Sequence, residues 1–181
     1  VNDAFAENKI AAFIKPKEGF PFMMVTWPGM IGAVSGMNYE GLTVTINASK
    51  SKIPLSAKTP ISILTREILQ HAKTLDEAIT IAKKRKVFVS ESIMVGSAND
   101  NKAILIEVSP NKMDVYDVAN SDQLICSNHF QGEAFAADKR NLEQIANSHS
   151  EYRLERMQEL LAENSKVNPK IASEILRNKD G

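Results

Sequence analysis

The sequence of 181 residues has very little of several features that define large classes of protein. It contains one cysteine, Cys126, so no intrachain disulfide framework can form. No apolar run approaches the roughly 20 residues that a membrane-spanning helix needs. Its 22 basic and 22 acidic residues cancel, so no net charge favours nucleic acid or an anionic membrane surface as a partner.

The signatures of common cofactor and hydrolase sites are also missing. Neither GxGxxG nor the P-loop pattern occurs, so no phosphate-binding glycine loop is predicted. No GxSxG nucleophile elbow is present. The three histidines, His71, His129 and His149, have no metal-ligand spacing among themselves. Val1 does not open a signal peptide.

What the sequence does contain is an ordered series of strand and helix patterns. The length suits one domain with one core, and 43% hydrophobic residues are enough to build it. Alternating apolar residues bounded by turn residues predict seven strands, over residues 20–27, 30–37, 42–47, 87–97, 103–109, 113–119 and 123–130. Apolar residues at helical spacing predict helices over residues 60–72, 74–86, 138–164 and 169–177. Residues 1–18 are expected to form a loop or a short helix.

The order of these elements indicates the fold class. Three strands, two helices, four strands and two helices follow one another, which is typical of a layered α+β protein. Two antiparallel sheets packed face to face, each covered outside by a helix pair, would bury most of the apolar faces. We therefore predict a four-layer αββα sandwich that forms a single domain over residues 1–181.

Three polar residues stand out because of the places that the predicted elements give them. Asn47 ends the strand LTVTIN, Asn128 lies near the end of another strand in CSNHF, and Arg153 lies in the helix SEYRLERM. Each also has an ordinary structural explanation, since strand-end asparagines form turns and helix arginines are commonly solvated. His129 is interpreted as a structural histidine, and Cys126 as a small buried apolar side chain.

Four segments, taken together and in this order, have a more specific meaning: TWPGMIGAVSGMNYEGLTVTINASKS, FVSESIMVGSANDNKAILIEVSP, ICSNHF and SHSEYRLERMQELL. They resemble the acyl-CoA:6-aminopenicillanic-acid acyltransferase family, which are cysteine-type N-terminal nucleophile (Ntn) hydrolases. They are similar, more distantly, to the choloylglycine hydrolases. The resemblance covers residues 20–178, and the family's αββα fold agrees with the independent argument from the order of elements.

The resemblance implies roles for the three polar residues. Asn47 matches the asparagine whose side-chain amide stabilises the oxyanion of the tetrahedral intermediate, a role suited to a neutral donor fixed by its strand. Asn128 matches the second active-site asparagine of choloylglycine hydrolases, near the amino group of the nucleophile. Arg153 matches their helix arginine, which orients the catalytic centre electrostatically. The resemblance implies no metal or organic cofactor, and small-molecule acyl amides or acyl thioesters as substrates.

One departure from the family concerns the nucleophile. Ntn chemistry needs a nucleophile at a free N-terminus, here expected to be cysteine, whose α-amino group with a pKa of about 8 serves as the base. Val1 cannot attack, Cys126 has no free amine, and the family's Arg and Asp after the nucleophile are not recognisable in residues 1–19. We therefore expect a central fragment of an amidase or acyltransferase, incomplete at both ends and inactive alone. Its exposed sheet edges are expected to favour self-association.

Two alternatives stay open at this point. One is an amidase of the choloylglycine type, acting on bile-salt or penicillin amides. The other is a non-catalytic αββα binding or interaction domain that kept the scaffold and lost the nucleophile. The full reading frame separates them, because an upstream cysteine followed within a few tens of residues by Arg and Asp favours the enzyme.

Overall fold

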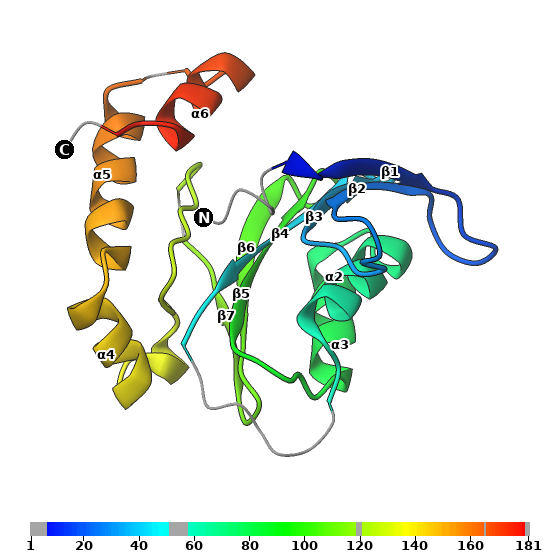
Figure 1. The fold of residues 1–181 in the computed structure, drawn as a ribbon, viewed down its shortest axis with the longest axis horizontal. Helices are drawn as coiled ribbons and strands as arrows, with labels where there is room; N and C mark the ends of the chain where they lie inside the picture. Colours follow the sequence, from blue (N-terminus) through cyan, green and yellow to red (C-terminus); the bar gives the residue numbers. More distant parts are fainter. Residues whose placement is uncertain (1–6, 51–57, 119–120, 165, 180–181) are drawn as a thin grey trace.

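The computed structural model describes residues 7–50, 58–118, 121–164 and 166–179. Figure 1 shows a twisted sheet with one helix pair on one face and the remaining helices beyond the other face. The strands are β1 Ile10–Ile14, β2 Phe22–Thr26, β3 Ser35–Asn38, β4 Leu42–Ala48, β5 Glu91–Ser97, β6 Lys102–Val108 and β7 Met113–Tyr116. The helices are α2 Ile61–His71, α3 Leu75–Lys84, α4 Lys139–Asn147, α5 Ser150–Ala162 and α6 Pro169–Leu176, with a short 3-10 turn, η1, at Glu133–Phe135. None of the described helices is long and apolar enough to cross a membrane.

The structure confirms the α+β class and changes how the strands are grouped. The seven described strands form one antiparallel sheet in the order β1-β2-β3-β4-β5-β6-β7. The sequence prediction had divided its strands, three and four, between two sheets. The two groups join because β4 pairs with β5 along its whole length, from Leu42 opposite Ser97 to Ala48 opposite Glu91.

Three predicted elements are wrong in detail. Residues 10–14, expected in a loop or short helix, form the edge strand β1, which pairs with β2 from Ile10 opposite Thr26 to Ile14 opposite Phe22. Residues 123–130 are extended but form no strand. The helix predicted over residues 138–164 breaks into α4 and α5 at residues 148–149.

The main core lies between the sheet and the α2–α3 pair (Figure 1). Alternate residues of the central strands face these helices, and their side chains are almost fully buried: Leu42, Val44, Ile93, Val95, Ile104 and Ile106. From the helix side, Leu64, Ile68 and Leu69 of α2 and Ala78 and Ala82 of α3 meet them. The predicted N-cap of α3 is present, since the Thr74 hydroxyl accepts from the backbone N–H of Glu77. The reciprocal bond of a capping box is displaced by one residue, because the Glu77 carboxylate accepts from the N–H of Lys73 and not of Thr74.

Asn38 ties the turn between β3 and β4 to the end of α2. Its side-chain amide donates to the backbone oxygens of Leu69 at 3.0 Å and Ala72 at 2.7 Å. Its Oδ1 accepts from the backbone N–H groups of Glu40 and Leu42. Only 3% of Asn38 is exposed, so all four hydrogen bonds are made away from solvent. The asparagine of the GMNYEG motif is therefore a structural residue.

The opposite face of the sheet carries a polar row that crosses four strands. Asn47 of β4 pairs with Ser92 of β5, Ser92 with Glu107 of β6, and Glu107 with Asp114 of β7. These residues alternate with those that face α2 and α3, so their side chains lie on the other face. Residues 121–135 run across this face, and α4, α5 and α6 lie beyond them (Figure 1).

The side chains of the polar row fix the segment that crosses them. The Glu107 carboxylate is fully buried and accepts from the backbone N–H groups of Gln131 at 2.7 Å and Gly132 at 2.8 Å. Asp114 accepts from the backbone N–H of Ala134 at 2.8 Å. Because side chains take up the hydrogen-bonding groups of this segment, it needs no neighbouring strand.

The same holds within residues 123–130. The N–H groups of Asn128 and Phe130 donate to the side chains of Ser150 and Asn141, and the carbonyl oxygens of Cys126 and Ser127 accept from Asn47. These side-chain bonds replace strand pairing, so the predicted strand does not form.

Candidate active site

Asn47 lies near the end of β4 on the face of the polar row. Its Nδ2 is 3.3 Å from the carbonyl oxygen of Cys126 and 3.3 Å from that of Ser127. The residue is half-buried and is paired with Ser92 inside the sheet, so it is a strand residue rather than a turn residue. A neutral amide donor is thereby held by a rigid element and points toward the crossing segment.

Asn128 and Arg153 form the next part of the same constellation. Asn128 Nδ2 donates to the carbonyl oxygen of Ala48, at the end of β4, over 2.8 Å. Arg153 Nη2 in turn donates to Asn128 Oδ1 at 2.8 Å, and Arg153 Nε donates to the carbonyl oxygen of His149 at 3.2 Å. Arg153 is exposed, yet it is fixed by contacts rather than freely solvated. The structure therefore brings Asn47, Asn128 and Arg153 together.

Ser150, the first residue of α5, holds the backbone of this constellation. Its hydroxyl accepts from the N–H of Asn128 at 2.7 Å, lies 2.8 Å from His129 Nδ1 and donates to Ser127 Oγ at 3.0 Å. Ser150 is completely buried. A hydroxyl has one hydrogen, so Ser150 can donate to only one of its partners and accepts from the others. Sequence reasoning missed Ser150, because a serine at the start of a helix is normally explained as a cap.

His129 is a structural histidine, as interpreted from the sequence. It is buried at 6% exposure and bonded to Ser150. Burial lowers the pKa of His129, Glu151 opposes that change, and the positive charge of Arg153 adds to it. The imidazole is therefore neutral at physiological pH and acts as a fixed hydrogen-bonding group.

Cys126 does not have the properties of a nucleophile. Burial raises the pKa of its thiol to about 12, the charge of Glu107 adds to the rise, and the polar side chain of Ser92 opposes it. The thiol donates to the carbonyl oxygen of Ser127 at 3.4 Å. A thiol with such a pKa remains protonated at neutral pH, and only the thiolate attacks.

A cavity of about 340 Å³ adjoins these residues, between the end of β4, residues 126–127, α5 and α6. Such a volume is within the range of small-molecule sites. Its apolar lining comes from Met157, Leu160, Ile175 and Leu176, and its polar lining from Asn47, Cys126, Ser127, Tyr152, Arg153, Arg156, Asn178 and Lys179. No carboxylate is found among the described lining residues, so the cavity is positively charged. Its lining therefore offers both apolar contacts and hydrogen-bond donors suited to negative charge.

No group of three or more metal-ligating side chains occurs in the described parts of the chain. The polar groups of the site are amides, hydroxyls and guanidinium groups, which are hydrogen-bond donors rather than typical metal ligands. The chemistry that this arrangement supports directly is stabilisation of a developing oxyanion by a positioned amide.

Comparisons with solved structures identify the fold. An N-acylethanolamine-hydrolyzing acid amidase ortholog from Caenorhabditis elegans matches with a TM-score of 0.68 at 17% identity, over 98% of this chain and 76% of that one. A mutant of conjugated bile acid hydrolase from Clostridium perfringens matches with a TM-score of 0.59 at 14% identity, over 94% and 70%. Penicillin V acylase from Agrobacterium tumefaciens matches with a TM-score of 0.54 at 14% identity, and the chain spans 55% of its length. All three are Ntn hydrolases, so the chain has the Ntn hydrolase fold.

The sequence itself identifies the family. No curated protein sequence matches the chain significantly. The family model described as acyl-coenzyme A:6-aminopenicillanic acid acyl-transferase matches residues 5–181, almost the whole sequence. That match agrees with the family resemblance of the four sequence segments and with the fold. The chain belongs to the acyl-coenzyme A:6-aminopenicillanic acid acyl-transferase family.

Proposed function

We propose that this chain provides the oxyanion-binding part of an Ntn amidase or acyltransferase active site, with Asn47 as the donor. The observation that carries the proposal is the convergence of Asn47, Asn128 and Arg153 beside a cavity that has both apolar and positively charged lining residues. The family membership and the Ntn hydrolase fold support the reaction class. In this proposal, residues 1–181 form a single Ntn hydrolase-like domain, and no metal or organic cofactor takes part.

Asn47 is suited to stabilise the oxyanion because its amide is fixed before any substrate arrives. Its two hydrogen bonds to the carbonyl oxygens of Cys126 and Ser127 are long, at 3.3 Å each. An oxyanion is a stronger acceptor than a peptide carbonyl, so it would compete well for the same N–H groups. The bond would strengthen as negative charge develops, which is the condition for lowering the barrier.

Asn128 and Arg153 act as orienting groups in this proposal. Asn128 donates to the end of β4 and accepts from Arg153, so its amide cannot rotate without losing both bonds. The guanidinium of Arg153 adds positive charge beside the reacting centre, which favours anionic forms near it. Ser150 fixes the backbone of Asn128 through its N–H.

The nucleophile in this proposal is a cysteine at a free N-terminus, outside the 181 residues. Its thiolate attacks the acyl carbon, and the carbonyl oxygen becomes the oxyanion that Asn47 binds. Collapse of that intermediate breaks the C–N or C–S bond, and the α-ammonium group protonates the leaving amine or thiolate. Water or a second amine then attacks the thioester and regenerates the thiolate. The raised pKa of Cys126 is a reason not to assign it this role.

The proposed substrates are small linear acyl amides or acyl thioesters. Met157, Leu160 and Ile175 would contact the acyl chain, and Arg153, Arg156 and Lys179 would surround its polar end. The structural neighbours are named for N-acylethanolamines, conjugated bile acids and penicillin V, and all three substrate classes contain an amide bond. A choloylglycine-type amidase is therefore the alternative within the same chemistry.

The test uses two forms of the protein and a panel of these amides together with an acyl-CoA. We expect no turnover from the 181-residue chain, and turnover from the protein of the full reading frame that has a free N-terminal cysteine. Product release from the 181-residue chain that is abolished by Cys126→Ser would overturn the assignment of the nucleophile. A full reading frame without an upstream cysteine would favour a non-catalytic binding domain.

We also propose that the 181-residue chain self-associates through its sheet edge. The outer side of β1 pairs with no other described strand, and unpaired strand edges recruit partners. Phe13 of β1 is 80% exposed, and Met37 of β3 is 48% exposed on the same face of the sheet. A dimer joined at β1 would cover part of this surface. Light scattering that shows a strict monomer at every concentration would count against it.

A further inference from the structure

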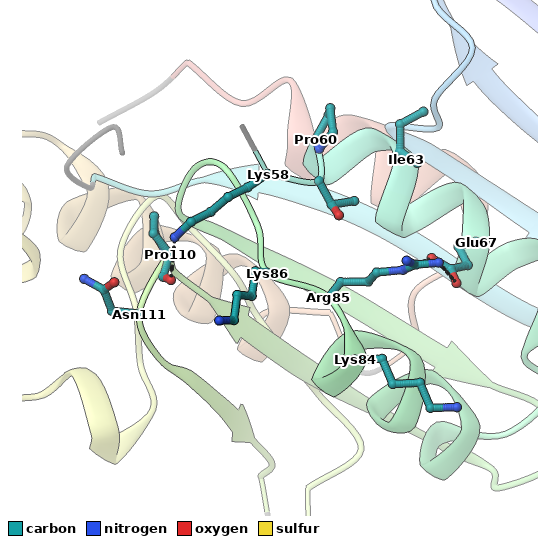
Figure 2. A pocket seen from close by; sticks show the side chains of 10 residues that line it. Lys58, Pro60, Ile63, Glu67, Lys84, Arg85, Lys86, Pro110 and Asn111 are labelled. Carbon is teal, nitrogen blue, oxygen red and sulfur yellow. Dashed lines mark hydrogen bonds and ion pairs between the residues drawn. The ribbon is translucent and has the colours of Figure 1, made fainter. Parts of the chain in front are cut away.

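A second hollow lies on the α2–α3 side of the sheet, away from the Asn47 site (Figure 2). Its volume is about 960 Å³. The described lining residues come from three places: residues 58–60 with the first turns of α2, residues 84–86 at the end of α3, and residues 110–111 in the β6–β7 turn. We call this hollow the basic groove, because four of its ten described lining residues are lysine or arginine.

The walls of the basic groove are fixed by backbone hydrogen bonds. The N–H of Thr59 donates to the carbonyl oxygen of Lys86 at 2.9 Å, and the N–H of Phe88 donates to that of Thr59 at 3.0 Å. The β6–β7 turn is closed by the N–H of Ser109, which donates to the carbonyl oxygen of Lys112 at 2.8 Å. The groove is therefore formed before any ligand arrives, which lowers the entropic cost of binding.

The charges in the basic groove do not cancel. Glu67 is the only carboxylate among the described lining residues, and Arg85 binds both of its oxygens at 2.7 Å. In the described parts of the chain, Lys58, Lys84 and Lys86 form no ion pair. Three positive charges therefore remain in one hollow of a chain whose net charge is zero.

The fold gives a local reason for Lys84 and Lys58 but none for Lys86, and neither reason neutralises the positive charge. Lys84 is the last residue of α3, where a cation is favoured by the helix dipole. Lys58 and Lys86 lie outside the helices, and Figure 2 shows them approaching the β6–β7 turn from different segments. Lys58 Nζ donates to the carbonyl oxygen of Pro110 at 3.0 Å, and among the described residues the side chain of Lys86 has no hydrogen-bond partner. Placing like charges close together costs folding free energy. Binding of an anionic ligand is therefore a better explanation for this lysine cluster than the fold alone.

The N-terminus of α2 adds to the positive electrostatic potential of the basic groove. Its N-cap residue, Pro60, makes no side-chain hydrogen bond, and no acidic residue lies in the first turn. The partial positive charge of the helix end is therefore not neutralised by the helix itself. Together with the three lysines, this makes the groove a site for a multiply charged anion.

We propose that the basic groove binds a soluble ligand that carries two linked phosphate groups. A single carboxylate would balance one of the three ammonium groups, whereas two linked phosphates can balance all three. Lysine ammonium groups are compact charges with several donors, and they suit phosphate oxygens without demanding one orientation. No aromatic residue is found among the described residues of the groove, so recognition rests on the phosphates and not on stacking with a base.

The test is a titration of the 181-residue chain with inorganic pyrophosphate and, separately, with inorganic phosphate, followed by calorimetry and by amide chemical shifts. We expect pyrophosphate to bind more tightly than phosphate and to shift the amides of Thr59, Lys86 and Asn111. We expect its affinity to fall as salt is added, since the lysines are exposed to screening. Shifts spread evenly over the surface, or no binding at low salt, would overturn the proposal.

Matched variants separate a specific site from general attraction. Lys58→Gln with Lys86→Gln should weaken pyrophosphate binding about tenfold, as expected from two lost charge pairs. Lys15→Gln with Lys17→Gln removes the same charge from the β1–β2 connection, and should leave the affinity unchanged. Equal losses in both double variants would refute the proposal.

A further experiment distinguishes a soluble ligand from a lipid headgroup as the occupant of the basic groove. Vesicles of phosphatidylcholine with phosphatidate are mixed with the chain and sedimented. We expect the chain to stay in solution, or to be displaced from the vesicles by pyrophosphate. Sedimentation that pyrophosphate does not displace would indicate a membrane contact and would contradict the proposal. The results of these binding experiments do not depend on the proposed amidase chemistry, because none of the substituted lysines adjoins the Asn47 cavity.

Discussion

Ser150→Ala tests how the candidate site is held together, because one buried hydroxyl serves three partners there. The substitution leaves the Asn128 N–H, His129 Nδ1 and Ser127 Oγ without their partner. Each unsatisfied buried polar group costs about 1–3 kcal/mol, and the smaller figure applies where water can enter. Asn128 is half-buried, whereas His129 and Ser127 are buried. Taking the smaller figure for each of the three groups, we expect Ser150→Ala to lower the free energy of unfolding by about 3 kcal/mol.

The measurement is urea unfolding of the wild-type chain and the variant, combined with hydrogen exchange at Asn128. We expect its amide to exchange faster even at low urea, since its acceptor has gone. Ser148→Ala is the matched control, because Ser148 lies two residues away and its half-buried hydroxyl has only local backbone partners, accepting from the N–H of Ser150 and donating to the carbonyl oxygen of Gln144. It should cost about 1 kcal/mol or less. If Ser150→Ala were no more destabilising than this control, the hydrogen-bond hub would have no energetic importance.

Two further predictions concern stability. Burial raises the pKa of Glu91 from 4.5 to about 7, so the folded chain holds a proton that the unfolded chain releases. The contribution of Glu91 to stability should therefore be greatest below pH 4.5 and should be lost as pH rises through about 7, by about 1–2 kcal/mol because the side chain is partly exposed. Glu91→Gln should remove this contribution from a pH series of urea unfolding curves, and an unchanged slope between pH 4.5 and 7 would contradict the assignment. Asn38→Ala removes the side chain that ties the β3–β4 turn to α2, and should cost about 2–4 kcal/mol in the same assay without changing kcat of the folded enzyme. A loss of kcat at full folding would place Asn38 in the active site instead.

The sequence was informative wherever local pattern and tertiary contacts agree. In β4 the residues Leu42 and Val44 alternate with threonines, and Thr74 caps α3 as predicted. The strand β1 was missed because its consecutive alanines give no alternation and its Phe13 is exposed. Alternation in residues 123–130 suggested a strand, but their hydrogen bonds depend on side chains distant in the sequence.

The main feature that the sequence could not predict was the pairing of strands that lie far apart in the chain. Nothing in residues 42–48 specifies that they pair with residues 91–97 rather than with a separate sheet. The polar row has the same origin, since Asn47, Ser92 and Glu107 become neighbours only through strand register. Asn47, Asn128 and Arg153 were selected through the family resemblance, and the structure shows that they lie together. Their catalytic roles remain proposals.

The most direct test of the central proposal is kcat of Asn47→Ala in the protein of the full reading frame, with its N-terminal cysteine free. The expected loss is about 10²–10³-fold, the usual effect of removing one oxyanion donor. Asn47→Asp should be at least as damaging, because a carboxylate would repel the oxyanion. Both variants should keep most of their stability, since the half-buried side chain makes only two long hydrogen bonds. If folded Asn47→Ala retains most of its kcat, Asn47 does not stabilise the oxyanion and the proposed role is wrong.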